Sequence, residues 1–214
     1  MTKPRVVLAD DHTLVLEGFK RMLEDTCDLV AMVEDGRALI EAAVRFDPDL
    51  VILDISMPLL NGIDAARQLK KQCPRAKLLF ITMHADRAYL KAAFQAGASG
   101  YLLKRSASDE LEEAIRAVMK GHYYITPLMT RDVIDSLLKE SPDEASQEDP
   151  LTSRQREILQ LVGEGRSAKE IAKLLDLSPR TVEFHKAQIM EQLDLHTTAD
   201  LVKYAIAKGL ISPA

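Results

Sequence analysis

Five polar side chains stand at the ends of four short apolar runs in the N-terminal half of the chain. They belong to Asp10 and Asp11 after "RVVLA", Asp54 after "LVIL", Thr82 after "LLFI" and Lys104 after "YLL". Carboxylates that come together repel one another unless a cation lies among them. Mg²⁺ binds a few carboxylates together with water and phosphate oxygens. With the lysine and the threonine beside them, these carboxylates have the chemistry of a phosphoryl site whose nucleophile is a carboxylate.

Each of these side chains also has an ordinary structural interpretation. Asp11 fits the N-cap of a helix that begins near Thr13, and Asp54 fits the cap of a loop. Thr82 fits a hydroxyl at the end of a strand, and Lys104 fits a solvated charge. Caps and solvated charges do not readily explain why all five fall at the ends of four strands, so the phosphoryl-site hypothesis is favoured.

The elements that would position these residues alternate between two hydrophobic patterns. Short apolar runs typical of strands are "RVVLAD", "DLVAMVED", "PDLVILD", "AKLLFIT" and "ASGYLLK". Amphipathic segments with apolar residues three and four apart are "HTLVLEGFKRMLED", "GRALIEAAVRF", "NGIDAARQLKKQC", "DRAYLKAAFQAG" and "SASDELEEAIRAVMKG". Five such pairs predict a parallel sheet with helices on both faces. Functional groups of these sheets gather beyond the carboxyl ends of the strands.

Composition narrows the class of protein. The chain has 214 residues, 47% of them hydrophobic, and no apolar run reaches the roughly 20 residues of a membrane span. The N-terminus has no long apolar segment behind its basic residues, so we expect no signal peptide. Cys27 and Cys73 lie far apart without metal-like spacing, which fits a reduced cytoplasmic chain.

A middle segment, 122–149, separates two parts of the chain. A helix is predicted from Pro127 to Lys139, with the proline in its first turn. The following "ESPDEASQEDP" predicts a flexible linker, since it is polar and acidic and carries two prolines. The segment has 2 basic and 7 acidic side chains and so holds most of the chain's acidic excess.

The C-terminal part, 150–214, has only helical signals. "TSRQ" and "SAKE" are capping-box sequences, and "SP" at 178–179 places a proline at the first position of a third helix. A fourth helix is predicted over 198–208, closed by Gly209. Only "DLS" remains between the second and third helices, and two short helices joined so tightly indicate a helix-turn-helix.

The third helix has a face suited to nucleic acid. Phe184 lies opposite the apolar side of this helix, where it fits a contact with a thymine methyl in the major groove, although contact with another protein is an alternative. Glu183 fits the amino group of a cytosine, and the basic and hydroxyl side chains nearby fit phosphates. The DNA-binding residues assigned on this basis are Lys169, Arg180, Thr181, Glu183, Phe184, Lys186 and Ala187.

Residues 1–121 resemble the receiver domain of two-component response regulators. The resemblance rests on the Asp10–Asp11 pair, "DISMPLLNG" around Asp54, "ITMHA" at Thr82 and "GYLLKR" at Lys104. It implies a flavodoxin-like, five-stranded parallel sheet of order 2-1-3-4-5.

The same resemblance implies the roles of individual residues. Asp54 would accept a phosphoryl group from a sensor histidine kinase. Asp11, Asp54 and the main-chain carbonyl of Ser56 would hold Mg²⁺, with Asp10 helping through water. Thr82 and Tyr101 would form the switch pair, with Thr82 moving to the phosphoryl oxygen and Tyr101 turning inward behind it.

Ser56 and His84 lie two residues after Asp54 and Thr82. We therefore expect them to flank the phosphoryl group and to set the rate at which water removes it. The alternative is two exposed loop residues without a role.

Residues 150–214 resemble the LuxR-type helix-turn-helix domain, an all-α unit of four helices. The matching pieces are "LTSRQREIL", "AKEIA" and "TVEFH". Receiver and helix-turn-helix together resemble the NarL/FixJ family of transcriptional response regulators. The resemblance implies a phosphorylation-dependent regulator that binds double-stranded DNA, forms a homodimer when phosphorylated or DNA-bound, and works with RNA polymerase.

Two other classes of function compete with this one. One is a DNA-binding regulator whose receiver makes only protein contacts and is never phosphorylated. The other is a metal-dependent phosphatase with an aspartyl nucleophile, but "ADDH" lacks the D-x-D arrangement and no cap is inserted. We therefore expect no enzyme beyond self-phosphorylation and self-dephosphorylation at Asp54.

Overall fold

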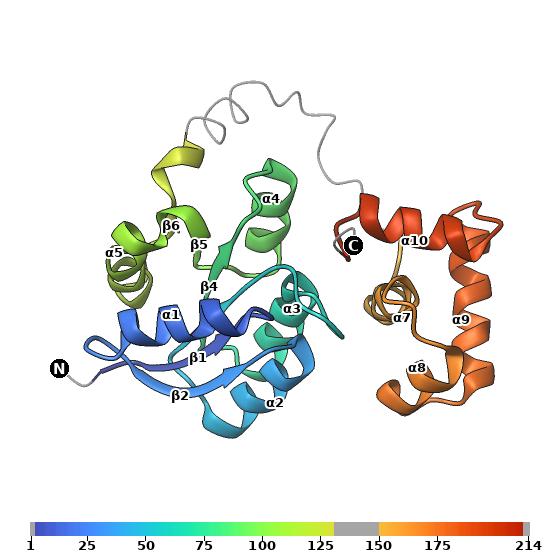
Figure 1. Ribbon diagram of the computed structural model, residues 1–214, viewed down its shortest axis with the longest axis horizontal. Coiled ribbons are helices and arrows are strands. Elements are labelled where there is room, and N and C mark those ends of the chain that lie inside the picture. Colours follow the sequence, from blue (N-terminus) through green and yellow to red (C-terminus); the bar gives the residue numbers. More distant parts are fainter. Residues whose placement is uncertain (1–2, 131–149, 212–214) are drawn as a thin grey trace. The chain divides into compact units, whose positions relative to one another are not determined.

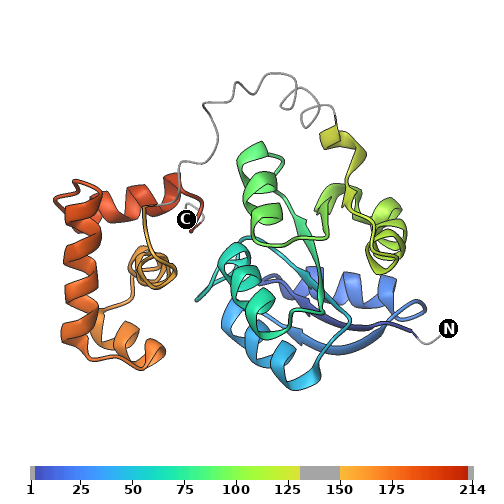
Figure 2. The ribbon, with the colours of Figure 1, turned by 180° about the vertical axis from the view of Figure 1, so that it is seen from behind.

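The computed structural model describes residues 3–130 and 150–211, and the chain divides into two compact units. The first unit contains the sheet and the helices that cover it, and the second contains the last four helices of the chain (Figures 1 and 2). The acidic segment predicted to be a flexible linker lies outside the described residues. The boundaries 121 and 150 therefore stay predictions.

A parallel sheet forms the centre of the first unit, with strand order β2-β1-β3-β4-β5-β6. Its strands are β1 (Arg5–Ala9), β2 (Asp28–Val33), β3 (Leu50–Leu53), β4 (Lys77–Thr82), β5 (Gly100–Leu103) and β6 (Tyr124–Ile125). The predicted order of the first five strands is confirmed. In β3 every residue is buried, which is why this strand reads as a continuous apolar run.

The prediction of five strands was wrong by one. β6 adds to the edge of the sheet, with Tyr124 opposite Gly100 and Ile125 opposite Tyr101. The next residue, Thr126, donates its main-chain N–H to the carbonyl of Tyr101 at 2.9 Å. A strand of two residues is too short for any hydrophobic period, so this part of the segment 122–149 could not be separated from a linker by its pattern.

Helices cover both faces of the sheet. They are α1 (Thr13–Leu23), α2 (Gly36–Phe46), α3 (Gly62–Gln72), α4 (Arg87–Gln95) and α5 (Ala107–Met119). α1 and α5 share one core with the side chains on one face of the strands, including Leu8, Ile52 and Ile81. α2, α3 and α4 lie side by side on the other face (Figures 1 and 2).

Two helices of this unit, α4 and α5, end at the glycines that the sequence predicts. Gly97 and Gly121, with φ of 98° and 85°, follow α4 and α5 in the left-handed region that favours glycine. α4 begins after Asp86, whose carboxylate accepts from the N–H of Ala88. Pro127 also begins a helical segment, described as far as Thr130, and the rest of the helix predicted there lies outside the described residues.

The second unit is a small bundle of α7 (Ser153–Gly163), α8 (Ala168–Leu175), α9 (Pro179–Gln192) and α10 (Thr198–Ala207). Its core joins all four helices through buried residues such as Leu159, Ile171, Val182 and Leu201. The prediction of four helices is confirmed for this part of the chain.

Capping fixes the starts of these helices. Both predicted capping boxes form, at Thr152 with Gln155 and at Ser167 with Glu170. Ser178 caps α9 ahead of Pro179. Between α8 and α9, Asp176 adopts φ 53°, so the chain turns within three residues as a helix-turn-helix requires.

The two cysteines, Cys27 and Cys73, are both buried free thiols, and burial raises the pKa of each.

Among the helices that the structure describes, none has the length and apolar character needed to cross a membrane.

Candidate functional site

The sheet brings Asp10 and Asp54 to the same edge. Asp10 directly follows β1 and donates its N–H to the carbonyl of Val33 at 3.1 Å. Asp54 directly follows β3 and donates its N–H to the carbonyl of Ala9 at 3.0 Å. These main-chain bonds extend the sheet by one residue, and both aspartates are almost fully buried. Each carboxylate is therefore held by rigid backbone.

Lys104 lies between these two carboxylates. Its ammonium is 2.6 Å from Asp10 Oδ2 and 2.7 Å from Asp54 Oδ2, and its side chain is 10% exposed. Burial by itself would lower the pKa of Lys104, but the charges and hydrogen bonds of Asp54 and Asp10 together raise it. The lysine thus stays positively charged at neutral pH and links the ends of β1, β3 and β5.

Asp10, Asp54 and Lys104 together form the acceptor pocket, and Asp11 follows Asp10 with a side chain that is 34% exposed. Its carboxylate is 2.7 Å from Nδ1 of His12, which is also 3.2 Å from Asp10 Oδ1. α1 begins after His12, and no side chain caps it. The interpretation of Asp11 as an N-cap is therefore wrong, because Asp11 stands one residue too early. A carboxylate oxygen of Asp11 lies instead within 4.8 Å of side-chain atoms of Asp10 and His12.

Thr82 and Tyr101 both bind the loop that leads to α4. Thr82, fully buried, accepts at Oγ1 from the N–H of His84 at 3.3 Å. Tyr101 donates its hydroxyl to the carbonyl of His84 at 2.8 Å. Its ring is fully buried, so it already occupies the inward position, and burial raises the pKa of its hydroxyl.

Ser56 and His84 contact each other across the pocket. Ser56 Oγ lies 2.8 Å from Nε2 of His84, and both side chains are half-buried. The imidazole also stacks on Tyr89 of α4, with ring centroids 4.1 Å apart and planes 25° apart. The two side chains are therefore not exposed as the alternative supposed, and their role in phosphate loss stays a prediction.

Two residues of this pocket escaped the sequence analysis. His12 had a visible signal, because it directly follows the two aspartates. Tyr89 had none, because its contact with His84 depends on the path of the residues between β4 and α4, which no periodicity encodes.

The donor set fits a hard divalent cation. The pocket offers carboxylate oxygens of Asp10, Asp11 and Asp54, and the main-chain carbonyl of Ser56 follows on the same loop. Oxygen ligands of this kind suit Mg²⁺. Three carboxylates outnumber the single ammonium of Lys104, which leaves a negative pocket that a divalent cation would neutralise.

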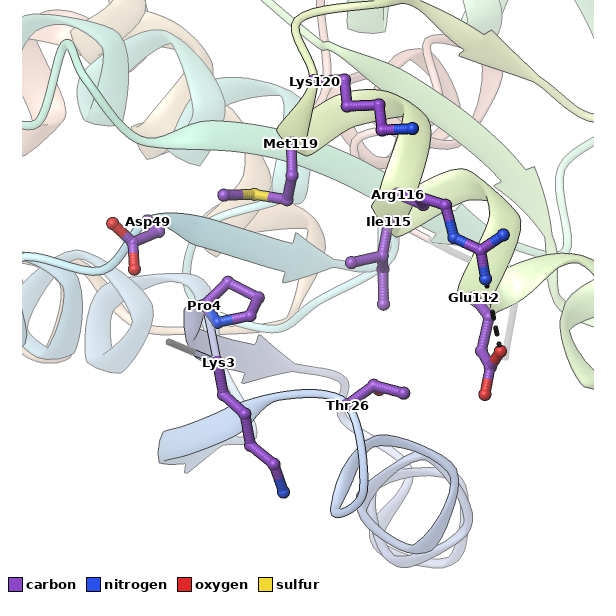
Figure 3. Close-up of a pocket in the computed structure, with 9 residues that line it drawn as sticks. All are labelled: Lys3, Pro4, Thr26, Asp49, Glu112, Ile115, Arg116, Met119 and Lys120. Atoms are coloured by element: carbon purple, nitrogen blue, oxygen red, sulfur yellow. Dashed lines mark ion pairs between the residues drawn. The ribbon is translucent and has the colours of Figure 1, made fainter. Parts of the chain in front are cut away.

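A cavity of about 530 Å³ lies at the other end of the sheet (Figure 3). Residues that precede the strands and the last turns of α5 line it. Lys3 donates to the carbonyl of Glu24, and Arg116 faces Glu112 at 3.8 Å. The cavity lies at the amino ends of β1, β2 and β3, whereas Asp10 and Asp54 follow the carboxyl ends of their strands, so it is separate from the carboxylate site.

In the second unit, α9 presents the predicted face. Val182 and Ile189 are buried in the core, whereas Phe184 on the opposite side is 59% exposed. Of the other predicted DNA-binding residues, Lys169, Arg180, Glu183 and Ala187 are exposed, and Thr181 and Lys186 are half-buried. An exposed aromatic ring flanked by cationic side chains suits a groove of double-stranded DNA.

Together, a lysine-bridged pair of aspartates at the carboxyl edge of a parallel α/β sheet and a C-terminal helix-turn-helix define the class of transcriptional response regulators. Residues 6–116 match the response regulator receiver domain, and residues 149–205 match the bacterial regulatory proteins of the luxR family. The chain belongs to the response regulators of the NarL/FixJ family.

Relatives match along nearly the whole chain. The transcriptional regulatory protein MctR of Rhizobium johnstonii is 38% identical over 98% of this chain and 96% of its own. The oxygen regulatory protein NreC of Staphylococcus carnosus is 36% identical over 97% of this chain and 99% of its own. RcsB of Salmonella enterica, in a structure bound to a promoter in the presence of a phosphomimetic, has a TM-score of 0.58, with 30% identity over 94% of this chain and 98% of its own.

Proposed function

We propose that this response regulator is switched by phosphorylation of Asp54 and that the switched form controls transcription by binding double-stranded DNA through α9. The observation that carries the proposal is the ammonium of Lys104 bound to Asp10 and Asp54 at once. A sensor histidine kinase is the proposed phosphoryl donor, and the cytoplasm is the proposed compartment.

Phosphoryl transfer would use Asp54 as the nucleophile. A carboxylate oxygen of Asp54 attacks the phosphorus of a kinase phosphohistidine, a P–O bond forms, the P–N bond breaks, and the histidine nitrogen leaves with the electron pair. The fixed backbone after β3 supports this role because positioning supplies much of the catalysis in phosphoryl transfer.

The neighbouring side chains would receive the transferred group. Lys104, already 2.7 Å from Asp54 Oδ2, can donate to a phosphoryl oxygen. Asp10, Asp11, Asp54 and the carbonyl of Ser56 would hold Mg²⁺. When bound, the ion supplies positive charge against the developing charge of the phosphoryl oxygens.

The switch would act on the loop after β4. Thr82 now accepts from the N–H of His84, and Tyr101 donates to the carbonyl of the same residue. A phosphoryl oxygen would accept from the hydroxyl of Thr82 and draw this side chain toward Asp54, which would weaken the bond that Oγ1 accepts from the N–H of His84. The loop and the start of α4 would then change their hydrogen bonds. Phosphorylation would thereby alter the surface near Tyr101 and α4 and favour a homodimer on DNA, where RNA polymerase is the proposed further partner.

Hydrolysis of the phosphoryl group would depend on Ser56 and His84. Their side chains lie 2.8 Å apart on the loops that follow β3 and β4, where they would restrict the access of water to a phosphoryl group on Asp54. Ser56→Ala and His84→Ala should each change the rate of phosphate loss. Rates equal to the wild-type rate would remove this part of the proposal.

The decisive experiment measures intact mass after incubation with a small-molecule phosphodonor, with and without Mg²⁺. We expect a gain of one phosphoryl group that requires Mg²⁺ and is absent in Asp54→Asn. Asp86→Asn is the matched control, because Asp86 caps α4 and asparagine caps a helix as well as aspartate does. A gain in Asp54→Asn would contradict the assignment of the acceptor.

A second measurement separates the alternative in which the receiver makes only protein contacts. Sequences selected from random double-stranded DNA by the phosphodonor-treated protein are titrated with wild type and Asp54→Asn under the same conditions. Tighter binding by the wild type supports the proposal. Equal affinity would favour the unphosphorylated regulator.

A further inference from the structure

The stack between His84 and Tyr89 connects α4 to the acceptor pocket. Tyr89 lies in the first turn of α4, and its ring is 4.1 Å from the imidazole of His84 with the two planes 25° apart. Both rings are half-buried. Offset stacking of this kind stabilises one relative orientation of the two rings.

Every part of His84 is held by a different neighbour. Its Nε2 lies 2.8 Å from Ser56 Oγ, its N–H binds Thr82, and its carbonyl accepts from Tyr101. The main-chain bonds fix the position of the residue but leave the side-chain torsions free. Within residues 3–130, the Ser56 hydrogen bond and the Tyr89 ring are the contacts that select the direction of the imidazole. Tyr89 therefore supplies a restraint on orientation that the loop itself does not contain.

We propose that Tyr89 is a positioning residue that lengthens the lifetime of the phosphorylated state by holding the His84 imidazole over the acceptor pocket. The inference rests on the proposed phosphorylation of Asp54. In the hydrolysis step the oxygen of water bonds to phosphorus and the P–O bond to Asp54 breaks. Inorganic phosphate is released, the aspartate carboxylate is restored, and the proton of water passes to phosphate or solvent.

The position of Tyr89 gives this stack a regulatory meaning. His84 belongs to the loop, whereas Tyr89 belongs to α4, so any displacement of α4 changes the overlap of the two rings. A partner that binds α4 and weakens the stack would shorten the lifetime of the phosphoryl group.

The test follows loss of the phosphoryl group from the full chain by intact mass after the phosphodonor is removed. We expect Tyr89→Ala to speed this loss about fivefold, the effect of one aromatic pair. Tyr89→Phe, which keeps the stacked ring, should retain the wild-type lifetime. Arg87→Ala, an exposed residue of the same turn, is the control for α4 itself and should also leave the lifetime unchanged. A lifetime of Tyr89→Ala equal to or longer than wild type would overturn the proposal.

Two further measurements separate positioning from a general loosening of α4. In the His84→Ala background, Tyr89→Ala should add no further change, because its effect passes through the imidazole. In NMR spectra without any phosphodonor, the ring protons of His84 should show an upfield shift in wild type and Tyr89→Phe, and lose it in Tyr89→Ala. An additive double variant or an unshifted wild-type imidazole would contradict the inference. Failure of wild type to gain phosphoryl would instead refute the proposed function.

Discussion

The acceptor pocket and the outward face of α9 carry similar residue types in opposite physical states. In the pocket, Asp10, Asp54 and Lys104 are buried and bound to one another. On α9, the exposed charged side chains Arg180 and Glu183 stand in solvent around Phe184. The side chains of the pocket are held in place before any ligand binds. The exposed side chains of α9 would be held only when DNA binds to them. Substitutions should therefore act on folding in the first region and on binding in the second.

Loss of the bridging ammonium should have the largest effect. Lys104→Met leaves two buried carboxylates facing each other, and we expect the free energy of unfolding to fall by about 3 kcal/mol in the absence of divalent cations. Urea unfolding of the full chain, followed by circular dichroism, measures the change. Added Mg²⁺ should restore part of it.

The matched control is the same substitution at an exposed lysine of the second unit, Lys169 in α8. Lys169 is exposed, so Lys169→Met should shift the free energy of unfolding by no more than about 0.5 kcal/mol. Equal losses of unfolding free energy in the two variants would contradict the distinction between a preorganised pocket and an exposed surface.

Loss of the exposed Phe184 ring should have the next largest effect. Phe184→Ala should weaken DNA binding about tenfold without changing thermal unfolding, since the ring has little to contact within its own unit. Titration of selected DNA sequences that contain or lack thymine at one position tests whether the loss depends on the thymine methyl. Unchanged affinity would assign Phe184 to a protein contact instead.

A smaller effect is expected from Arg180. Arg180→Ala should weaken binding to all DNA sequences alike and reduce the slope of affinity against salt by about 1, because a phosphate contact carries no sequence information. Affinities measured at several salt concentrations give the slope. A loss confined to particular sequences would assign Arg180 to a base.

The smallest effect concerns the capping box of α8. Hydrogen bonds from Ser167 lower the pKa of Glu170 in the folded state, so its contribution to stability is present above about pH 4.3, the ordinary glutamate value, and disappears as the pH falls through the lower folded value. The difference in thermal stability between wild type and Glu170→Ala should therefore shrink on acidification. Glu170→Gln keeps the box without a titrating group, so its own stability should change less with pH. A difference that grows in acid would contradict this sign.

Most residues of the acceptor pocket could be predicted from the sequence, but the contact that joins the pocket to α4 could not. Asp10, Asp54 and Lys104 could be brought together in advance because parallel strands end at one edge and buried charges require partners. The caps at Thr152 and Ser167 could be predicted because they depend on residues only three apart. The stack of Tyr89 on His84 and the edge pairing of β6 depend on how a loop or an edge runs in space, and two-residue strands carry no period.

The sixth strand has a practical consequence for dividing the protein. β6 covers the outer edge of β5, and the side chains of Tyr124 and Thr126 both donate to the carboxylate of Glu110 in α5. A fragment that stops at Gly121 would expose the carbonyls of Ser99 and Tyr101 along a bare edge, which invites pairing with another copy. Such a fragment could self-associate for a reason unrelated to signalling. Chimeras and truncations intended to report the native assembly state should therefore retain the chain through Thr130.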